Sequence, residues 1–256
     1  MTLRGAAPLQ IGCVKYLNAQ PLIHGWPGPV VFDHPSVLCR QLADGELDLA
    51  LVSSFEFLRD PIYTIADGVA VAADGAVFSV FVAHKTRIED AREIGLDPAS
   101  ATSVNLLRCL LAEHGLNPRL RTDGQSIDDA RLLIGDQALA FRQEQRASFQ
   151  YWDLGAEWKR LTGLPFVFAL WLIRPEMRDP SALAEKLRHL RDANLAGLDR
   201  VIAAQENFEP EFCAFYFRQC LRFDLGDAEK AGLLRFRSLC EKHGILPPNP
   251  APLRLA

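Results

Sequence analysis

The sequence predicts an α/β protein of two lobes, and three observations support this prediction. Apolar segments of strand length alternate with segments of helical spacing between residues 9 and 52, which favours parallel strands joined by right-handed crossovers. A polar, proline-marked loop at 97–103 opens a second group of such segments. Helical patterns run from Ser181 onward. We therefore expect a discontinuous lobe of residues 1–87 plus 175–256 and an inserted lobe of residues 88–174.

The first lobe is expected to begin as strand, helix and strand. A helical pattern follows Ser36, a plausible N-cap, and Gly45 falls near its expected end. The dipeptide Asp74-Gly75 is a strong turn signal and separates two further apolar runs. The expected strands are 9–14, 30–32, 47–52, 63–71 and 76–83.

The second lobe is expected to open with a helix from Val104 to Glu113, which stops at His114-Gly115. A buried strand at 132–134 ends in a turn, and a helix spans 154–161. The most apolar run, 166–173, predicts a strand buried on both faces. In the C-terminal region, a core-facing helical stripe is expected at Phe212, Phe215, Tyr216 and Leu221.

Composition excludes several classes of protein. The chain has 256 residues, 49% of them hydrophobic, and a net charge of −4 without a repeated basic stretch, so no nucleic-acid partner is expected. The start resembles no export signal, and the run 166–173 is too short to cross a bilayer, so we expect a cytoplasmic protein with no membrane partner. Six cysteines without a C-x-x-C pair are expected to be reduced, and neither a metal nor another cofactor is expected. The oligomeric state is not predicted.

Several kinds of catalytic site are also not indicated. The sequence contains no G-x-S-x-G, H-E-x-x-H, G-x-G-x-x-G or Walker A motif, and the six histidines form no recognisable ligand pair. His84 follows an apolar strand, and we expect it to be solvated rather than to face a cleft.

Small polar residues instead follow the expected strands. Ligands of open α/β sheets bind beyond the carboxyl ends of strands, so a small-molecule site is expected in the cleft between the lobes. Several candidates also have a simpler structural role: Thr102 and Ser103 could hold an anion at a helix start or cap that helix, and Asn18 could be a cleft donor or a turn residue. Ser53 and Ser54 could be donors that face the cleft or residues of a turn and cap, and Asp136 could bind the ligand or cap the next segment. The candidate binding residues are Tyr16, Ser53, Ser54, Ser79, Thr102, Ser103, Gly135 and Asp136, with Asn18 as the candidate catalytic residue.

Six segments together resemble one known family, the chorismate dehydratases of the futalosine route to menaquinone. The most specific are GCVKYLNAQPL at 12–22 and WKRLTGLPFVFA at 158–169. The remaining four are 48–54, 74–79, 102–108 and 132–136. The sequence departs from the family pattern at Lys15, where we expect a smaller polar residue, and at Ser53, where we expect proline.

The resemblance implies a type II periplasmic-binding-protein fold. It also implies a hydro-lyase that removes water from chorismate to give 3-[(1-carboxyvinyl)oxy]benzoate, with the enolpyruvyl carboxylate of the substrate as the base. Because the residues alone indicate hydroxyls and amides but no protein base, the two lines of inference agree. The alternatives are a small-anion solute-binding protein, the sibling 1,4-dihydroxy-6-naphthoate synthase, and a ligand-sensing regulator domain.

Overall fold

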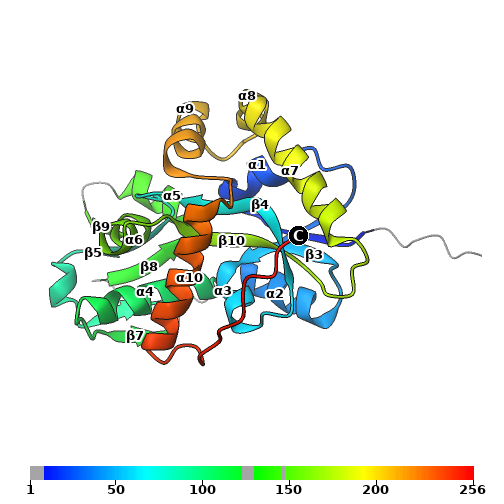
Figure 1. Cartoon of the computed structure of the whole chain (residues 1–256). Coiled ribbons are helices and arrows are strands. Elements are labelled where there is room, and N and C mark those ends of the chain that lie inside the picture. The colour runs from blue at the N-terminus through cyan, green and yellow to red at the C-terminus, as the bar shows by residue number, and fades with distance from the viewer. Residues whose placement is uncertain (1–8, 98, 123–129, 146–147) are drawn as a thin grey trace, which may run out of the picture.

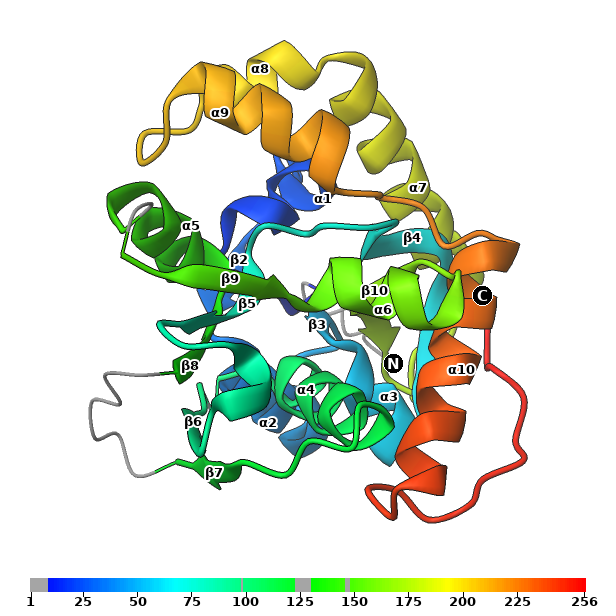
Figure 2. The same cartoon turned by 90° about the vertical axis from the view of Figure 1, so that its left-hand side faces the viewer.

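The fold consists of two five-stranded mixed sheets with helices packed on their faces (Figures 1 and 2). The computed structural model describes residues 9–97, 99–122, 130–145 and 148–256. The strand orders are β2-β1-β3-β10-β4 in the first sheet and β7-β6-β8-β5-β9 in the second. The predicted α/β class with mixed sheets is confirmed, but the expectation that the sheets are mostly parallel is not. In each sheet, two of the four pairings between described strands are parallel and two are antiparallel.

The first sheet is built around a parallel core of three strands. β1 pairs in parallel with β2 and β3, and β10 joins β3 and β4 antiparallel. All eight residues of β10 are buried, as the uninterrupted apolar run predicted. The strands are β1 (Ile11–Val14), β2 (Val30–Asp33), β3 (Leu49–Ser53), β4 (Thr64–Ala73) and β10 (Phe166–Ile173).

The second sheet joins a parallel half to an antiparallel half. β6 pairs in parallel with β7 and β8, whereas β5 pairs antiparallel with β8 and β9. The strands are β5 (Val80–His84), β6 (Glu93–Gly95), β7 (Arg119–Arg121), β8 (Ala130–Ile134) and β9 (Gln150–Asp153).

Sheet membership differs from the expected lobe bounds at two strands. The bounds 1–87 and 88–174 place β5 with the first sheet and β10 with the second, but each belongs to the other sheet. The chain therefore crosses between the sheets twice, before β5 and before β10. The turn signal Asp74-Gly75 falls directly after β4, as expected, but β4 and β5 do not pair, and residues 74–79 form a crossing segment between the sheets.

The helices cover both sheets and form a separate layer over the first (Figure 1). The longer ones begin and end close to the predicted positions. The helical elements are η1 (Leu17–Ala19), α1 (Gln20–Ile23), α2 (Pro35–Asp44), α3 (Ser54–Arg59), η2 (Ile88–Asp90), α4 (Ala101–Glu113), α5 (Gly135–Glu144), α6 (Leu154–Thr162), α7 (Pro180–Ala196), α8 (Leu198–Ala203), α9 (Pro210–Phe215), the π-helix η3 (Tyr216–Cys220) and α10 (Asp227–Lys242).

Two predicted helix starts are corrected. The N-cap of α2 is His34 rather than Ser36, because Pro35 occupies the first helical position, where its missing N–H costs no hydrogen bond. The helix ends as expected at Gly45, which has the left-handed φ of 79°. Likewise, α4 begins at Ala101 and not at Val104, because Ser100 is its cap.

The core is a continuous apolar cluster in which α10 packs against the start of β10. The rings of Phe166 and Phe236 meet at 5.0 Å, and Trp158 meets Phe166 at 5.1 Å. A Cβ on Gly232 of α10 would lie 2.0 Å from the carbonyl oxygen of Pro165. Only glycine therefore allows this close approach of helix and loop. Of the expected C-terminal stripe, Tyr216 and Leu221 are buried, whereas Phe212 and Phe215 are only half-buried.

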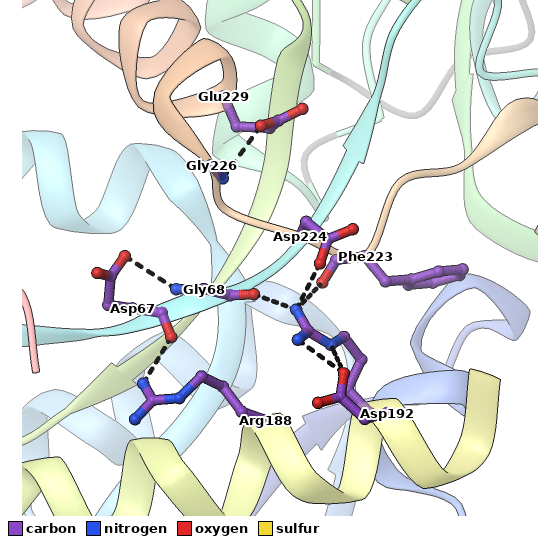
Figure 3. A network of polar contacts seen from close by, with 9 residues as sticks. Asp67, Gly68, Arg188, Asp192, Phe223, Asp224, Gly226 and Glu229 are labelled. Atoms are coloured by element: carbon purple, nitrogen blue, oxygen red, sulfur yellow. Dashed lines mark hydrogen bonds and ion pairs between the residues drawn. The ribbon is translucent and has the colours of Figure 1, made fainter. Parts of the chain in front are cut away.

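Two arginines of α7 fasten the C-terminal region to β4 (Figure 3). Arg188 donates to the carbonyl oxygen of Asp67 at 2.9 Å. Arg191, which is 9% exposed, donates to the carbonyl of Gly68 and forms an ion pair with Asp224 at 2.7 Å. The region after residue 175 thus packs onto the first sheet. No helix among the described residues is long and apolar enough to cross a membrane.

Candidate functional site

A narrow cleft of about 40 Å³ lies where the two sheets meet. Its walls come from the carboxyl ends of β1, β3 and β8, the start of α4, and the middle of β10. The lining residues are Val14, Tyr16, Asn18, Pro35, Ser53, Val80, Ser100, Ser103, Ile134, Gly135, Phe168 and Ala169. Five of the nine candidate residues line this cleft: Tyr16, Asn18, Ser53, Ser103 and Gly135. The other four lie just behind the walls: Ser54, Ser79, Thr102 and Asp136.

Asn18 has a side-chain oxygen that forms no hydrogen bond with the described residues. It lies in η1, directly after β1, and its side chain lines the cleft. Its Oδ1 atom is buried and has no hydrogen-bond partner among the described residues. Because a buried acceptor without a partner is costly, a ligand donor or a water molecule is the natural partner of this amide.

Ser53 and Thr102 form the contact between β3 and α4. Their hydroxyls are hydrogen-bonded at 2.5 Å, and the backbone N–H of Thr102 donates to the Ser53 hydroxyl at 3.0 Å. The N–H of Phe55 donates to the Thr102 hydroxyl at 3.0 Å. Ser54 is also occupied, because its hydroxyl donates to the carbonyl of Val167 at 2.7 Å. The hydroxyls of Thr102 and Ser54 therefore brace the cleft from behind.

The start of α4 leaves hydroxyls rather than backbone N–H groups for a ligand. The N–H of Ser103 already donates to the Ser100 hydroxyl at 3.3 Å, and the N–H of Thr102 is used by Ser53. The Ser103 hydroxyl donates to the Ser100 hydroxyl at 3.2 Å, so the O–H of Ser100 is the donor left for a ligand in this arrangement, and both residues line the cleft. Sequence reasoning missed Ser100, although a serine directly before a helical pattern is a signal for a cap.

Tyr16 and Gly135 pack against one another across the cleft. Gly135 has φ +62°, and a Cβ there would lie 2.7 Å from the Tyr16 ring. The Tyr16 hydroxyl lies 3.2 Å from Nδ1 of His34. Burial, with a smaller contribution from nearby Asp97 and Asp136, raises the pKa of Tyr16, so its hydroxyl stays protonated and can act as a donor.

Asp136 and Ser79 hold this wall in place. The carboxylate of Asp136 accepts from the N–H of Leu17 at 2.8 Å, which ties α5 to η1. Burial raises the pKa of Asp136. The Ser79 carbonyl accepts from the N–H of Gly135 at 2.8 Å, and its hydroxyl accepts from the Tyr216 hydroxyl at 2.7 Å. Sequence reasoning missed Tyr216 in this role, because its partner lies 137 residues away.

The chemistry that these walls can perform is limited to orientation and hydrogen bonding. None of the lining residues carries a carboxylate, an imidazole or an amine. The polar groups are serine hydroxyls, one phenol and one amide, whereas Val80, Ile134 and Phe168 supply apolar surface. His84 does not line the cleft, and its Nδ1 contacts the carbonyl of Thr86. Such a site suits a small polar molecule that needs neither a protein base nor a protein nucleophile.

Two mixed α/β sheets with a polar cleft between them define the class of two-lobed proteins with a periplasmic-binding-protein fold. The alkanesulfonate-binding protein of Xanthomonas axonopodis pv. citri bound to MOPS matches with a TM-score of 0.62, over 95% of this chain and 96% of that chain. Because the two sequences are 15% identical, this likeness shows the fold alone.

Sequence similarity places the chain in one family within this fold class. A family model described as menaquinone biosynthesis matches residues 9–242, and the chain belongs to that family. The chorismate dehydratase of Thermus thermophilus is 34% identical, covering 90% of this chain and 94% of its own. The chorismate dehydratase of Campylobacter jejuni is 26% identical, covering 88% and 91%. The resemblance drawn from the sequence motifs is thereby confirmed.

Proposed function

We propose that this chain is a hydro-lyase that removes water from chorismate in menaquinone biosynthesis. Membership of the family and the named relatives support the reaction. The structural observation that carries the proposal is a cleft lined by neutral hydrogen-bonding groups, with the unsatisfied amide of Asn18 at its wall. Chorismate carries two carboxylates, a hydroxyl and an enol ether, and each of these can accept hydrogen bonds from such groups.

The elimination needs a base and a departing hydroxyl. The ring carbon that bears the ether loses its proton, the adjacent carbon loses hydroxide, and proton and hydroxide leave together as water. The ring becomes aromatic, so the reaction has a large thermodynamic drive. Since no lining side chain is a base at neutral pH, the enolpyruvyl carboxylate of the substrate is the proposed base. The protein then contributes mainly by holding this carboxylate against the ring proton.

Two groups of residues carry the proposed contacts. The hydroxyls of Ser100 and Ser103 bind a substrate carboxylate, assisted by the positive end of the α4 dipole. Asn18 orients the reacting carboxylate by donating from its Nδ2 amide, or accepts from the departing hydroxyl through Oδ1, as a preorganised hydrogen-bonding group does for developing charge. Tyr16 is a further donor on the same wall.

An ultraviolet assay of chorismate with the purified protein tests this function, provided that mass spectrometry identifies the product. We expect loss of chorismate and formation of a product lighter by one water. The fold is shared with a solute-binding protein, so binding without turnover is the specific competing result. Saturable binding of chorismate with no product would refute the lyase and leave a binding protein. Prephenate, an isomer of chorismate that lacks the same ring diene, is the control substrate and should not be dehydrated to this product.

A further inference from the structure

We propose that a second cavity, separate from the catalytic cleft, binds a small aromatic carboxylate through Arg142. This cavity lies between α5 and α9 and holds about 330 Å³. Both views of the fold show α9 facing α5 from the C-terminal layer (Figures 1 and 2). Its lining residues are Phe78, Leu139, Arg142, Gln143, Tyr151 and Phe212, and it shares none of them with the cleft.

Arg142 is a half-buried cation that the fold uses only in part. Its side chain is 24% exposed, and its buried Nη1 atom has no hydrogen-bond partner among the described residues. Nη1 forms an ion pair with Asp153 at 3.6 Å, which is too long for a hydrogen bond. A guanidinium has five N–H donors, and leaving a buried one unsatisfied is costly. Arg142 can therefore accept a second anionic partner.

Asp153 does not neutralise this cation by hydrogen bonding. Its carboxylate accepts from the N–H groups of Val77 at 3.0 Å and Phe78 at 2.8 Å. It also caps α6, accepting from the N–H groups of Gly155 and Ala156 at 3.1 Å each. Because four backbone N–H groups already hold the Asp153 carboxylate, its interaction with Arg142 is a long ion pair, and the guanidinium keeps donors for an anion in the cavity.

The aromatic side chains around the guanidinium favour a ligand with an aromatic ring. The guanidinium lies 3.9 Å from the ring centroid of Phe78 and 5.0 Å from that of Tyr151. Phe78 is held in an unusual backbone conformation with φ 67°, and its ring packs against Phe215 at 5.0 Å. Phe212 supplies an aromatic surface from α9. A planar carboxylate can pair with the guanidinium fork while its ring packs among these side chains.

A fluorine NMR titration with 4-fluorobenzoate tests the site without reference to chorismate. Its outcome is therefore independent of the proposed lyase activity. We expect saturable binding to the wild-type protein with Kd in the range of about 1 mM or tighter, as befits a ligand of this size. The neutral isostere 4-fluorobenzamide should bind at least about tenfold more weakly, because it loses the charge-assisted bonds.

Three variants locate the probe. Arg142→Gln should raise the Kd of 4-fluorobenzoate by about tenfold or more. The matched control is Arg131→Gln, because Arg131 also lies over a phenylalanine ring, at 4.3 Å from Phe141, but outside the cavity. Ser103→Ala, which alters the catalytic cleft, should leave the Kd unchanged.

Each contrary outcome overturns the proposal. An unchanged Kd in Arg142→Gln would show that the guanidinium does not bind the probe. A Kd raised equally in Ser103→Ala would place the probe in the catalytic cleft. The comparison of benzoate with benzamide uses wild-type protein only, so it remains decisive even when a variant is unstable. Equal affinities for these two probes, or no saturable binding up to about 10 mM, would also refute the site.

Discussion

Replacing Asn18 with alanine should separate catalysis from stability. The Oδ1 atom of Asn18 is buried and has no hydrogen-bond partner in the part of the chain that the structure describes, and Asn18 lies inside the short helix η1. An unsatisfied buried acceptor costs about 1–3 kcal/mol, so removing it should leave the free energy of unfolding unchanged or raise it slightly. If the same amide stabilises the elimination, turnover should fall by about 100- to 1,000-fold, which corresponds to about 2.7–4 kcal/mol of transition-state stabilisation.

The assay measures initial rates and melting temperature on the same preparations of wild type, Asn18→Ala and Asn18→Asp. Asn18→Ala should lower kcat more than it raises KM, because the contact strengthens in the transition state. Asn18→Asp should be at least as damaging, because it adds a negative charge beside a dianionic substrate. A variant that melts early but keeps near-normal turnover per folded molecule would show that Asn18 is a turn residue, and would end its catalytic assignment.

Three further predictions test the site and the fold. Ser103→Ala should raise KM by about tenfold, since a charge-assisted hydrogen bond contributes roughly 1.5–3 kcal/mol; unchanged kinetics would leave Ser103 with a structural role only. Activity should survive chelation and desalting, and a complete loss restored by one divalent metal would contradict the reaction as proposed. Gly232→Ala should destabilise the fold by about 1–3 kcal/mol or more, because its Cβ would overlap the Pro165 carbonyl; a chemical denaturation midpoint equal to that of wild type would refute this packing argument.

Local pattern was sufficient for most of the secondary structure. The apolar run 166–173 could only be a buried strand, and Gly45 ends α2 with the left-handed backbone that its position suggested. The two helix starts were predicted wrongly because a nearby residue takes the expected role. The helix α2 begins at Pro35, before the expected cap Ser36, and Ser100 caps α4 in place of Thr102 or Ser103.

The candidate site was predicted in outline because parallel strands bring their carboxyl ends to one edge of a sheet. Asn18, Ser53 and Gly135 lie at or just after the ends of three different strands and meet in one cleft. Asp136 also follows a strand, whereas Ser79 directly precedes β5, and the polar atoms of these two residues serve Leu17 and Tyr216 instead. The periodicity of apolar residues indicates which residues face a core. It does not indicate which of two neighbouring polar side chains forms hydrogen bonds within the protein and which remains available for a ligand.

The order of the strands and motifs such as 12–22 and 158–169 were therefore sufficient to predict the family, the fold class and the approximate place of the cleft. The sequence did not predict that β5 belongs to the second sheet and β10 to the first, because a strand's partners are decided by packing between segments far apart in the sequence. The same holds for the contact of Tyr216 with Ser79 and for the aromatic surroundings of Arg142. These features arise only when the folded chain brings α9 close to α5, and η3 close to the segment before β5. Burial then decides which polar groups remain available for a ligand.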